Sequence, residues 1–346
     1  MKTHIIILLY IGVACVSSHI NRHEYHTASD LYNQGKIHVK QDGRHQPEYY
    51  GYVQHCPYAE DIAPCVCTHD SASNAMDLVC SSVESEEQLK QIFKADFPSK
   101  NFHQFQLHDN NNIKVLEAGV FNGVSFEIIN IYYTDLEVVE LQALDSCYET
   151  ATELRLYDNK ITSFPFDELS QFSKLSFFDI HSNSLSVIPA DAFQGLTALE
   201  YLDITYNSAD IVGTFQDLPN LQAIFLMNMG LTNIPAHFIK TGSSHLIYIG
   251  LYDNNIVSVE PDAFDILNDL EISMMYNSLS TLDEATWRPN LEAGGTLEAN
   301  GNPLVCGCDI AWLFGEDHLL KHVAKYATCT DGKLLHDLDP SRFDNC

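Results

Sequence analysis

An eleven-residue pattern that recurs every 22 to 25 residues constrains the fold of this chain more than any other feature. Its form is L-x-x-L-x-L-x-x-N-x-L, where L stands for an apolar residue. The stretch Leu246–Ile256 shows the pattern most clearly. Its positions 1, 4, 6, 9 and 11 are Leu246, Ile249, Leu251, Asn254 and Ile256. One such unit cannot bury its own apolar face, so it requires a similar unit on each side.

The neighbouring units exist, and all of them share one register. Position 9 is, in order, Asn110, Thr134, Asn159, Asn183, Asn207, Met229, Asn254, Asn277 and Asn302. Position 4 is Phe105, Ile129, Leu154, Phe178, Leu202, Ile224, Ile249, Ile272 and Leu297. Position 6 is Leu107, Ile131, Leu156, Ile180, Ile204, Leu226, Leu251, Met274 and Ala299. Because positions 4 and 6 are apolar in all nine units, the pattern indicates nine consecutive leucine-rich repeats.

Repeats of this class predict an α/β fold, a curved solenoid (horseshoe) with a parallel sheet on its concave face. The nine repeats span residues 99–304, and we expect apolar pairs such as Leu116 with Phe121 to close each coil on the convex side. The Asn side chain at position 9 should hydrogen-bond to backbone groups where the chain turns. These bonds should be weaker at Thr134 and Met229, which replace it.

Eight of the ten cysteines gather at the two ends of the repeat region, where a solenoid needs caps. The N-terminal cap, residues 56–98, includes a predicted short helix within Ser82–Pro98, and the C-terminal cap, residues 305–346, includes an apolar helix around Ile310–Leu320. A zinc site is the rival interpretation of the first group. The secretory signal predicted below for residues 1–18 favours disulfides instead. Caps of this kind usually pair the first cysteine with the third and the second with the fourth, although the spacing does not prove it. The expected pairs are Cys56–Cys67, Cys65–Cys80, Cys306–Cys329 and Cys308–Cys346.

Cys147 lies in an inserted convex segment and belongs to neither cap. We expect a buried free thiol, because the core residue Leu144 lies three positions earlier on the same side of a helical turn. An intermolecular disulfide is the alternative.

The N-terminal region has the features of secretory targeting. Residues 1–18 resemble a signal peptide, with Lys2, the apolar run Ile5–Val16 and expected cleavage after Ser18. Residues 19–55 are rich in His and Tyr without an apolar period, so we expect a disordered or loosely attached segment. Its six His residues offer a Zn²⁺ or Cu²⁺ site as the alternative. No later apolar run is long enough to span a bilayer, so we expect a secreted, extracellular protein without a membrane anchor.

Charge and motifs exclude several classes of function. The net charge of −29 disfavours nucleic acids and anionic membranes as partners. The chain contains no nucleophile elbow, P-loop, HExxH or dinucleotide motif, so we expect neither an enzyme nor a cofactor. Four acids are candidate calcium ligands, but acids on separate coils form no EF-hand-like loop, so no metal site is predicted. These acids are Asp158, Asp179, Asp203 and Asp253.

The outward residues of the strands should line one continuous concave face that binds a partner protein. In the common register this face is aromatic and acidic, with Arg155 as its cation. Tyr and Met are enriched at protein interfaces, and the acids would attract a cationic partner surface. The alternative is that Tyr and Asp merely suit solvated strands. The predicted contact residues are Tyr132, Tyr157, Phe177, Asp179, Tyr201, Asp203, Tyr206, Phe225, Tyr248, Tyr252, Asp253 and Tyr276.

Several segments are similar to one arthropod family, named for the non-catalytic subunit of Oplophorus-luciferin 2-monooxygenase. They are Cys65–Cys67, Ser82–Pro98, Thr162–Leu169 and Ile188–Asn207. The resemblance covers most of residues 56–346. It implies a secreted leucine-rich-repeat protein that does not oxidise luciferin itself and that accompanies a catalytic subunit.

The sequence therefore predicts a secreted, non-catalytic protein-binding solenoid, a companion or scaffold subunit for another secreted protein. The alternative is an extracellular recognition protein that binds microbial or matrix surfaces. An enzyme is the third and least supported hypothesis.

Overall fold

The computed structural model describes residues 54–213, 215–315 and 318–346. The predicted signal peptide, and all of the His-rich segment except Gln54 and His55, lie outside the described residues. None of the described helices has the length and apolar run that crossing a bilayer requires.

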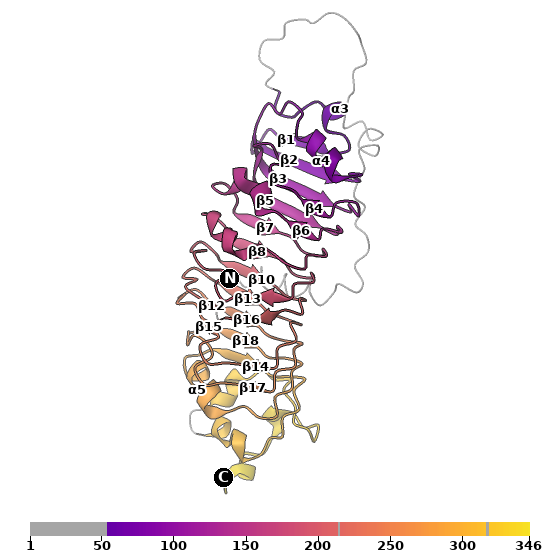
Figure 1. Cartoon of the computed structure of the whole chain (residues 1–346). Helices are drawn as coiled ribbons and strands as arrows, with labels where there is room; N and C mark the ends of the chain where they lie inside the picture. Colours follow the sequence, from indigo (N-terminus) through magenta and orange to yellow (C-terminus); the bar gives the residue numbers. More distant parts are fainter. Residues whose placement is uncertain (1–53, 214, 316–317) are drawn as a thin grey trace, which may run out of the picture. The chain divides into compact units, whose positions relative to one another are not determined.

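One sheet of eleven strands runs through the repeat region, as the periodicity predicted (Figure 1). All its neighbouring strands are parallel except β1 and β2, which form an antiparallel pair at the N-terminal end. The strands, in spatial order, are β1 (Val66–Asp70), β2 (Ala75–Ser81), β3 (Asn101–His108), β5 (Ser125–Tyr132), β7 (Glu153–Arg155), β8 (Phe177–Asp179), β10 (Tyr201–Asp203), β13 (Ala223–Phe225), β16 (Tyr248–Gly250), β18 (Glu271–Ser273) and β19 (Thr296–Glu298).

The register of this sheet never slips, because the apolar position-4 residues stack on one another from coil to coil. Phe178 pairs with Leu202, Leu202 with Ile224, and Ile224 with Ile249. A slip of one residue would turn every apolar side chain outward, so burial holds the pairing. The predicted curved solenoid is therefore the observed fold.

Short two-stranded ladders and helical turns close the coils on the other side of the core. The ladders are β4 (Val115–Leu116) with β6 (Val138–Val139), β9 (Val187–Ile188) with β11 (Asp210–Ile211), β12 (Phe215–Gln216) with β15 (Ile239–Lys240), and β14 (Asn233–Ile234) with β17 (Ser258–Val259). The helical elements here are the 3₁₀ turns η1 (Leu141–Cys147) and η2 (Phe166–Gln171) and the helix α5 (Glu284–Glu292). Leu116 and Phe121, predicted to close a coil, are fully buried.

Both ends of the repeat region carry disulfide-linked caps. The N-terminal cap contains α3 (Ala59–Ile62) and α4 (Glu86–Ile92), with the disulfides Cys56–Cys67 and Cys65–Cys80. The C-terminal cap contains η3 (Cys308–Phe314), η4 (Leu319–His322), η5 (Leu335–Asp337) and η6 (Pro340–Phe343), with Cys306–Cys329 and Cys308–Cys346. These are the pairs that the sequence led us to expect.

The predicted helices differ from the observed ones in length and type. Within Ser82–Pro98 the helix is only α4, where Ser85 caps the N-terminus by accepting a hydrogen bond from the Gln88 N–H. The apolar run around Ile310–Leu320 forms η3 and η4 instead of one helix. Gly315 has an extended backbone and His318 a left-handed one, and neither conformation can continue a helix.

Cys147 is buried and unpaired, which is the interpretation favoured from the sequence. It ends η1, beneath the convex surface. Burial raises the pKa of its thiol to about 11. An intermolecular disulfide would require this coil to open.

Candidate functional site

The outward side chains of the sheet form three columns that run along the concave face, because strand residues alternate between the two faces. We name them the first, second and third columns, after repeat positions 3, 5 and 7. The first is Gln104, Ile128, Glu153, Phe177, Tyr201, Ala223, Tyr248, Glu271 and Thr296. The second is Gln106, Asn130, Arg155, Asp179, Asp203, Phe225, Gly250, Ser273 and Glu298. The third is His108, Tyr132, Tyr157, His181, Thr205, Met227, Tyr252, Met275 and Asn300.

Four aromatic rings of the third column stack on one another over consecutive coils. The ring centroids are 5.3 Å apart from His108 to Tyr132, 5.1 Å from Tyr132 to Tyr157, and 5.0 Å from Tyr157 to His181. Neighbouring strands lie about 4.8 Å apart, so rings at the same repeat position are held at stacking distance. The stack makes this part of the face rigid, and burial raises the pKa of Tyr157 well above its ordinary value.

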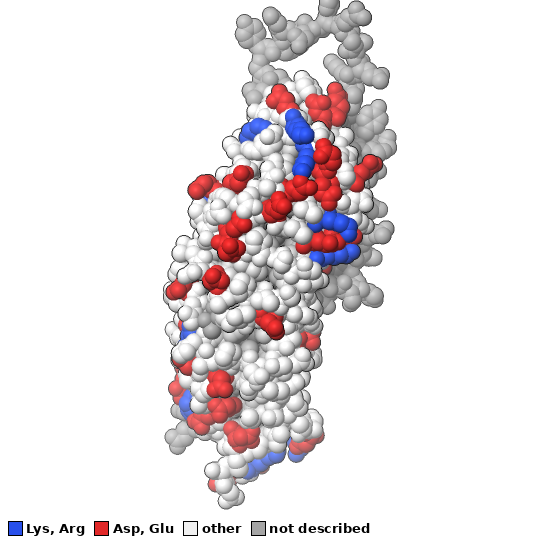
Figure 2. Space-filling view, in the orientation of Figure 1, with Lys and Arg blue, Asp and Glu red and all other residues white. Residues whose placement is uncertain are grey.

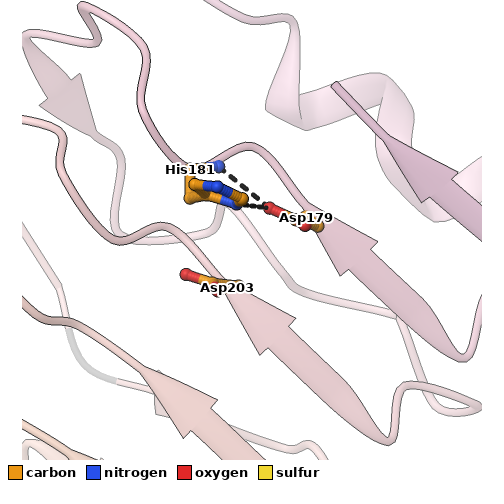
Figure 3. A group of neighbouring side chains, drawn as sticks. All are labelled: Asp179, His181 and Asp203. Carbon is orange, nitrogen blue, oxygen red and sulfur yellow. Dashed lines mark hydrogen bonds and ion pairs between the residues drawn. The ribbon is translucent and has the colours of Figure 1, made fainter. Parts of the chain in front are cut away.

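The stack ends on three ionisable side chains from two adjacent coils, which we call the Asp–His–Asp cluster: Asp179, His181 and Asp203 (Figure 3). Asp179 ends β8, and its Oδ1 accepts a hydrogen bond from the His181 backbone N–H at 3.0 Å. The Nδ1 atom of His181 lies 2.6 Å from the same oxygen. Asp203 ends β10, and its Oδ1 accepts a hydrogen bond from the Thr205 N–H at 2.9 Å.

Both carboxylates of the cluster are almost completely buried. Asp179 is 1% exposed and Asp203 is 6% exposed, whereas the His181 side chain is 25% exposed. Burial and the neighbouring charge of Asp179 together raise the pKa of Asp203 above its ordinary value. Burial alone would disfavour the imidazolium of His181, but the charge and hydrogen bond of Asp179, with Asp203, raise its pKa to about 9. His181 is therefore protonated at neutral pH and offsets one of the two carboxylates.

C-terminal to the cluster, the face is filled by its own aromatic side chains. The Tyr248 ring lies 5.3 Å from the Phe225 ring, and both residues are buried. A Cβ atom at Gly250 would stand 2.9 Å from the Tyr248 ring and 3.0 Å from the Met227 sulfur. Glycine at this position therefore lets the Tyr248 ring lie across the strand instead of projecting outward.

Arg155 is the single Lys or Arg in the three columns, all of whose members the structure describes. Its guanidinium pairs with Glu153 at 2.5 Å and lies 4.5 Å from the centroid of the Phe177 ring. The positive charge of Arg155 is thus offset by Glu153. The remaining acidic residues therefore make the net charge of the concave face negative.

The structure divides the twelve predicted contact residues by their accessibility. Those buried are Asp179, Asp203, Phe225, Tyr248 and Tyr252. Those half-buried are Tyr132, Tyr157, Phe177 and Tyr201, and those exposed are Tyr206, Asp253 and Tyr276. The buried members face outward by register, but neighbouring coils are close enough for large side chains to cover one another. That these twelve residues contact a partner stays a prediction.

Repeat position 8 lies elsewhere than the sequence suggested. We expected Tyr206, Asp253 and Tyr276 on the strand face, but all three have left-handed backbone, with φ of 53°, 57° and 52°. The same holds for position 8 of every other coil, from Asp109 to Gly301. These residues form the turn at the end of each strand, so they make up a rim beside the concave face.

Sequence reasoning also missed His181 as a member of a site. Asp179 and Asp203 are among the residues predicted from the sequence to contact a partner and, with two other acids, among the candidate calcium ligands, but His181 is in neither set. The signal was present: an Asp-x-His at one strand end, with an Asp at the equivalent position one coil later. Reading the repeats side by side would have brought the three residues together.

Comparison with known proteins agrees with the observed fold. A leucine rich repeat family model matches residues 173–231. The chain is 33% identical over 318 residues to the Oplophorus-luciferin 2-monooxygenase non-catalytic subunit of Oplophorus gracilirostris, covering 83% of this chain and 87% of that protein.

Two solved structures share the solenoid architecture. A chain of the TLR13–ssRNA13 complex matches with a TM-score of 0.56 and 25% identity over 66% of this chain and 32% of its own length. A chain of the octameric complex of Latrophilin 3, Unc5D and FLRT2 (LRR) matches with a TM-score of 0.55 and 19% identity over 84% of this chain and 99% of its own. The second likeness shows the fold alone.

Proposed function

The chain belongs to the leucine-rich-repeat family of the Oplophorus-luciferin 2-monooxygenase non-catalytic subunit, and from this we propose that it is a non-catalytic protein that binds a second protein. The family member is a subunit by name, so it acts in an assembly. By analogy, this chain serves as a companion or scaffold subunit. Four disulfides fit an oxidising compartment, which supports secretion and a secreted partner.

The observation that carries the proposal is the unbroken concave face. Its half-buried aromatic residues are held rigid by ring stacking and by the sheet, so binding them costs little side-chain entropy. The rim adds exposed Tyr276 and Asp253 at its turns. Rigid aromatic residues beside charged rims are typical of protein interfaces.

Charge indicates the chemistry of the partner. Arg155 is offset by Glu153, so the buried carboxylates and the rim acids leave the face negative. Acidic residues also outnumber basic ones over the visible surface in Figure 2. A cationic protein surface fits this face best, because opposite charge steers association and selects against anionic competitors.

Substitutions at accessible positions test the proposal. We expect Tyr157→Ala, Tyr201→Ala and Asp253→Lys each to weaken binding of the co-purified partner by about tenfold or more, since interface anchors cost more than about 1.4 kcal/mol when removed. Affinity would be measured by surface plasmon resonance, after the partner is identified by mass spectrometry of the native complex. Charge reversal at Asp179 or Asp203 is avoided, because it would bury a lysine.

Exposed residues of the C-terminal cap provide matched controls. Tyr326→Ala and Asp331→Lys make the same chemical changes away from the concave face and should leave affinity unchanged. Equal affinity of all five variants and the wild type would reject the concave face as the binding site. A monomer that captures glycans or bacterial surfaces, without a protein partner, would instead support a recognition protein.

A further inference from the structure

We propose that the Asp–His–Asp cluster binds a Zn²⁺ ion through one carboxylate oxygen each of Asp179 and Asp203 and one ring nitrogen of His181. One potential ligand atom from each residue lies within 4.8 Å of the other two. In a tetrahedral zinc site, bonds of about 2.0 to 2.2 Å place neighbouring ligand atoms somewhat more than 3 Å apart. Small side-chain rotations are therefore enough to bring the three atoms around one ion.

The cluster places three side chains that can each ligate a metal ion beside one another on two paired strands. Its two carboxylates are buried, at 1% and 6% exposure. A divalent ion bound by two carboxylates and a neutral imidazole makes the site electrically neutral.

Asp203 is positioned for a ligand that bridges the two coils. It accepts its hydrogen bond from Thr205, in its own coil, and no hydrogen bond joins it to Asp179 or His181. Figure 3 shows Asp179 and His181 bonded to each other, with the Asp203 carboxylate beside them on the next strand. A nearly fully buried carboxylate that approaches a His–Asp pair without bonding to it is what a shared metal ion would explain.

The surroundings hold the ligands in place. The His181 ring stacks on Tyr157 with an angle of 2° between the ring planes, which limits rotation of the imidazole. Both carboxylates stand at the ends of strands paired in fixed register, Asp203 opposite Asp179. Sites built on paired strands lose little entropy when the ion binds.

The donor set favours zinc over the common alkaline-earth ions. Ca²⁺ and Mg²⁺ prefer six or more oxygen ligands, whereas a nitrogen with two carboxylates suits Zn²⁺. Three protein ligands leave a fourth position for water or for a side chain of a bound molecule. His181 is partly exposed, so the ion has a path to the site.

Isothermal titration of the full-length chain with ZnCl₂ alone, without an affinity tag, tests the proposal. We expect His181→Gln and Asp203→Asn each to lose one zinc equivalent or to bind it at least tenfold more weakly. His237→Gln is the matched control, because His237 pairs with Asp262 at 3.1 Å on the surface without a second carboxylate. Histidines of residues 19–55 are present in all four proteins and add the same background.

The shift in melting temperature on adding zinc gives a second measurement, which separates binding at the cluster from binding elsewhere on the protein. Zinc should raise the melting temperature of the wild type and of His237→Gln, but not that of His181→Gln or Asp203→Asn. Circular dichroism without zinc shows whether each variant is folded. Equal zinc stoichiometry, affinity and thermal shift in all four proteins would overturn the proposal and leave the cluster as a metal-free ion pair.

Discussion

At the scale of single residues, the Asn at repeat position 9 joins each coil to the one before it. The Asn254 side chain donates to the carbonyl of Leu226 in the preceding coil at 2.9 Å and to that of Leu251 at 3.0 Å. Its Oδ1 accepts from the Met229 and Leu231 N–H groups at 2.9 and 3.1 Å. The amide is needed because it donates and accepts at once, which neither Thr nor Met can do in the same way.

The two substituted positions show the effect of losing this amide. The Thr134 hydroxyl accepts a hydrogen bond from the Leu136 N–H at 3.2 Å and donates one to the Asn159 side chain. Among the described residues, none of the hydrogen bonds of this hydroxyl reaches the preceding coil. Met229 offers only its backbone N–H, which Asn254 accepts. The expected weakening at these two positions agrees with the bonds observed.

We predict that Asn254→Ala lowers the free energy of unfolding by about 2 to 3 kcal/mol, because it leaves buried carbonyl and N–H groups without their partners. Asn255→Ala is the control, since this adjacent Asn is exposed and its backbone is not left-handed. It should cost less than about 0.5 kcal/mol. Urea unfolding followed by circular dichroism measures both; similar losses in the two variants would contradict the role of the ladder.

At the scale of elements, the pairing of neighbouring strands also brings like charges together. Glu271 of β18 and Glu298 of β19 lie on adjacent strands of the concave face. Burial and the charge of Glu298 raise the pKa of Glu271 above its ordinary value. Glu271 belongs to the first column and Glu298 to the second, so strand pairing makes them diagonal neighbours and creates an unfavourable carboxylate pair near the C-terminal cap.

We predict that Glu298→Gln stabilises the protein at pH 7 by about 0.5 kcal/mol, because it removes this repulsion. The raised pKa means that folded Glu271 takes up a proton at higher pH than the unfolded chain does. The destabilisation by the Glu271–Glu298 repulsion is therefore complete above the pKa of Glu271 in the folded protein. It disappears as pH falls from that value to the pKa of Glu271 in the unfolded chain. The stabilisation by Glu298→Gln should fade over the same range.

Glu260→Gln is the matched control for this prediction, since Glu260 is exposed and its removal changes the net charge equally. Thermal unfolding at pH 7 and at pH 4 would compare the two variants. An equal gain from both substitutions would assign the effect to net charge and not to the pair.

At the scale of the whole molecule, charge is unbalanced: 47 Asp and Glu residues face 18 Lys and Arg residues. The ion pairs on the surface, such as Lys114 with Glu137, neutralise few of these acids. Remaining repulsion acts between exposed carboxylates over distances comparable to the Debye length, so it depends on ionic strength.

We predict that raising NaCl from about 10 mM to about 150 mM stabilises the fold on the order of 1 kcal/mol, or about 2 °C in melting temperature, because salt screens the repulsion. Differential scanning calorimetry at pH 7 measures the shift. KCl should act equally, since screening does not depend on which monovalent cation is used. A melting temperature that falls with salt would show that ion pairs outweigh net repulsion.

By itself the sequence determined the solenoid, its nine coils and its single register. These follow from apolar residues at positions 4 and 6 and Asn at position 9, a pattern that only one repeated packing can bury. A pattern of this kind predicts the fold reliably because every coil buries the same repeat positions in the same way. The cysteine spacing likewise placed a cap at each end, and the expected pairs are those observed.

Only the tertiary structure decided which outward residues are accessible and which meet. Register places Tyr248 on the concave face, yet its ring folds across Gly250 and is buried. Asp179 and Asp203 are 24 positions apart in sequence, but strand pairing brings them beside His181 in a buried cluster. The physical reason is that burial and electrostatics depend on side chains from neighbouring coils, which a pattern within one repeat does not contain.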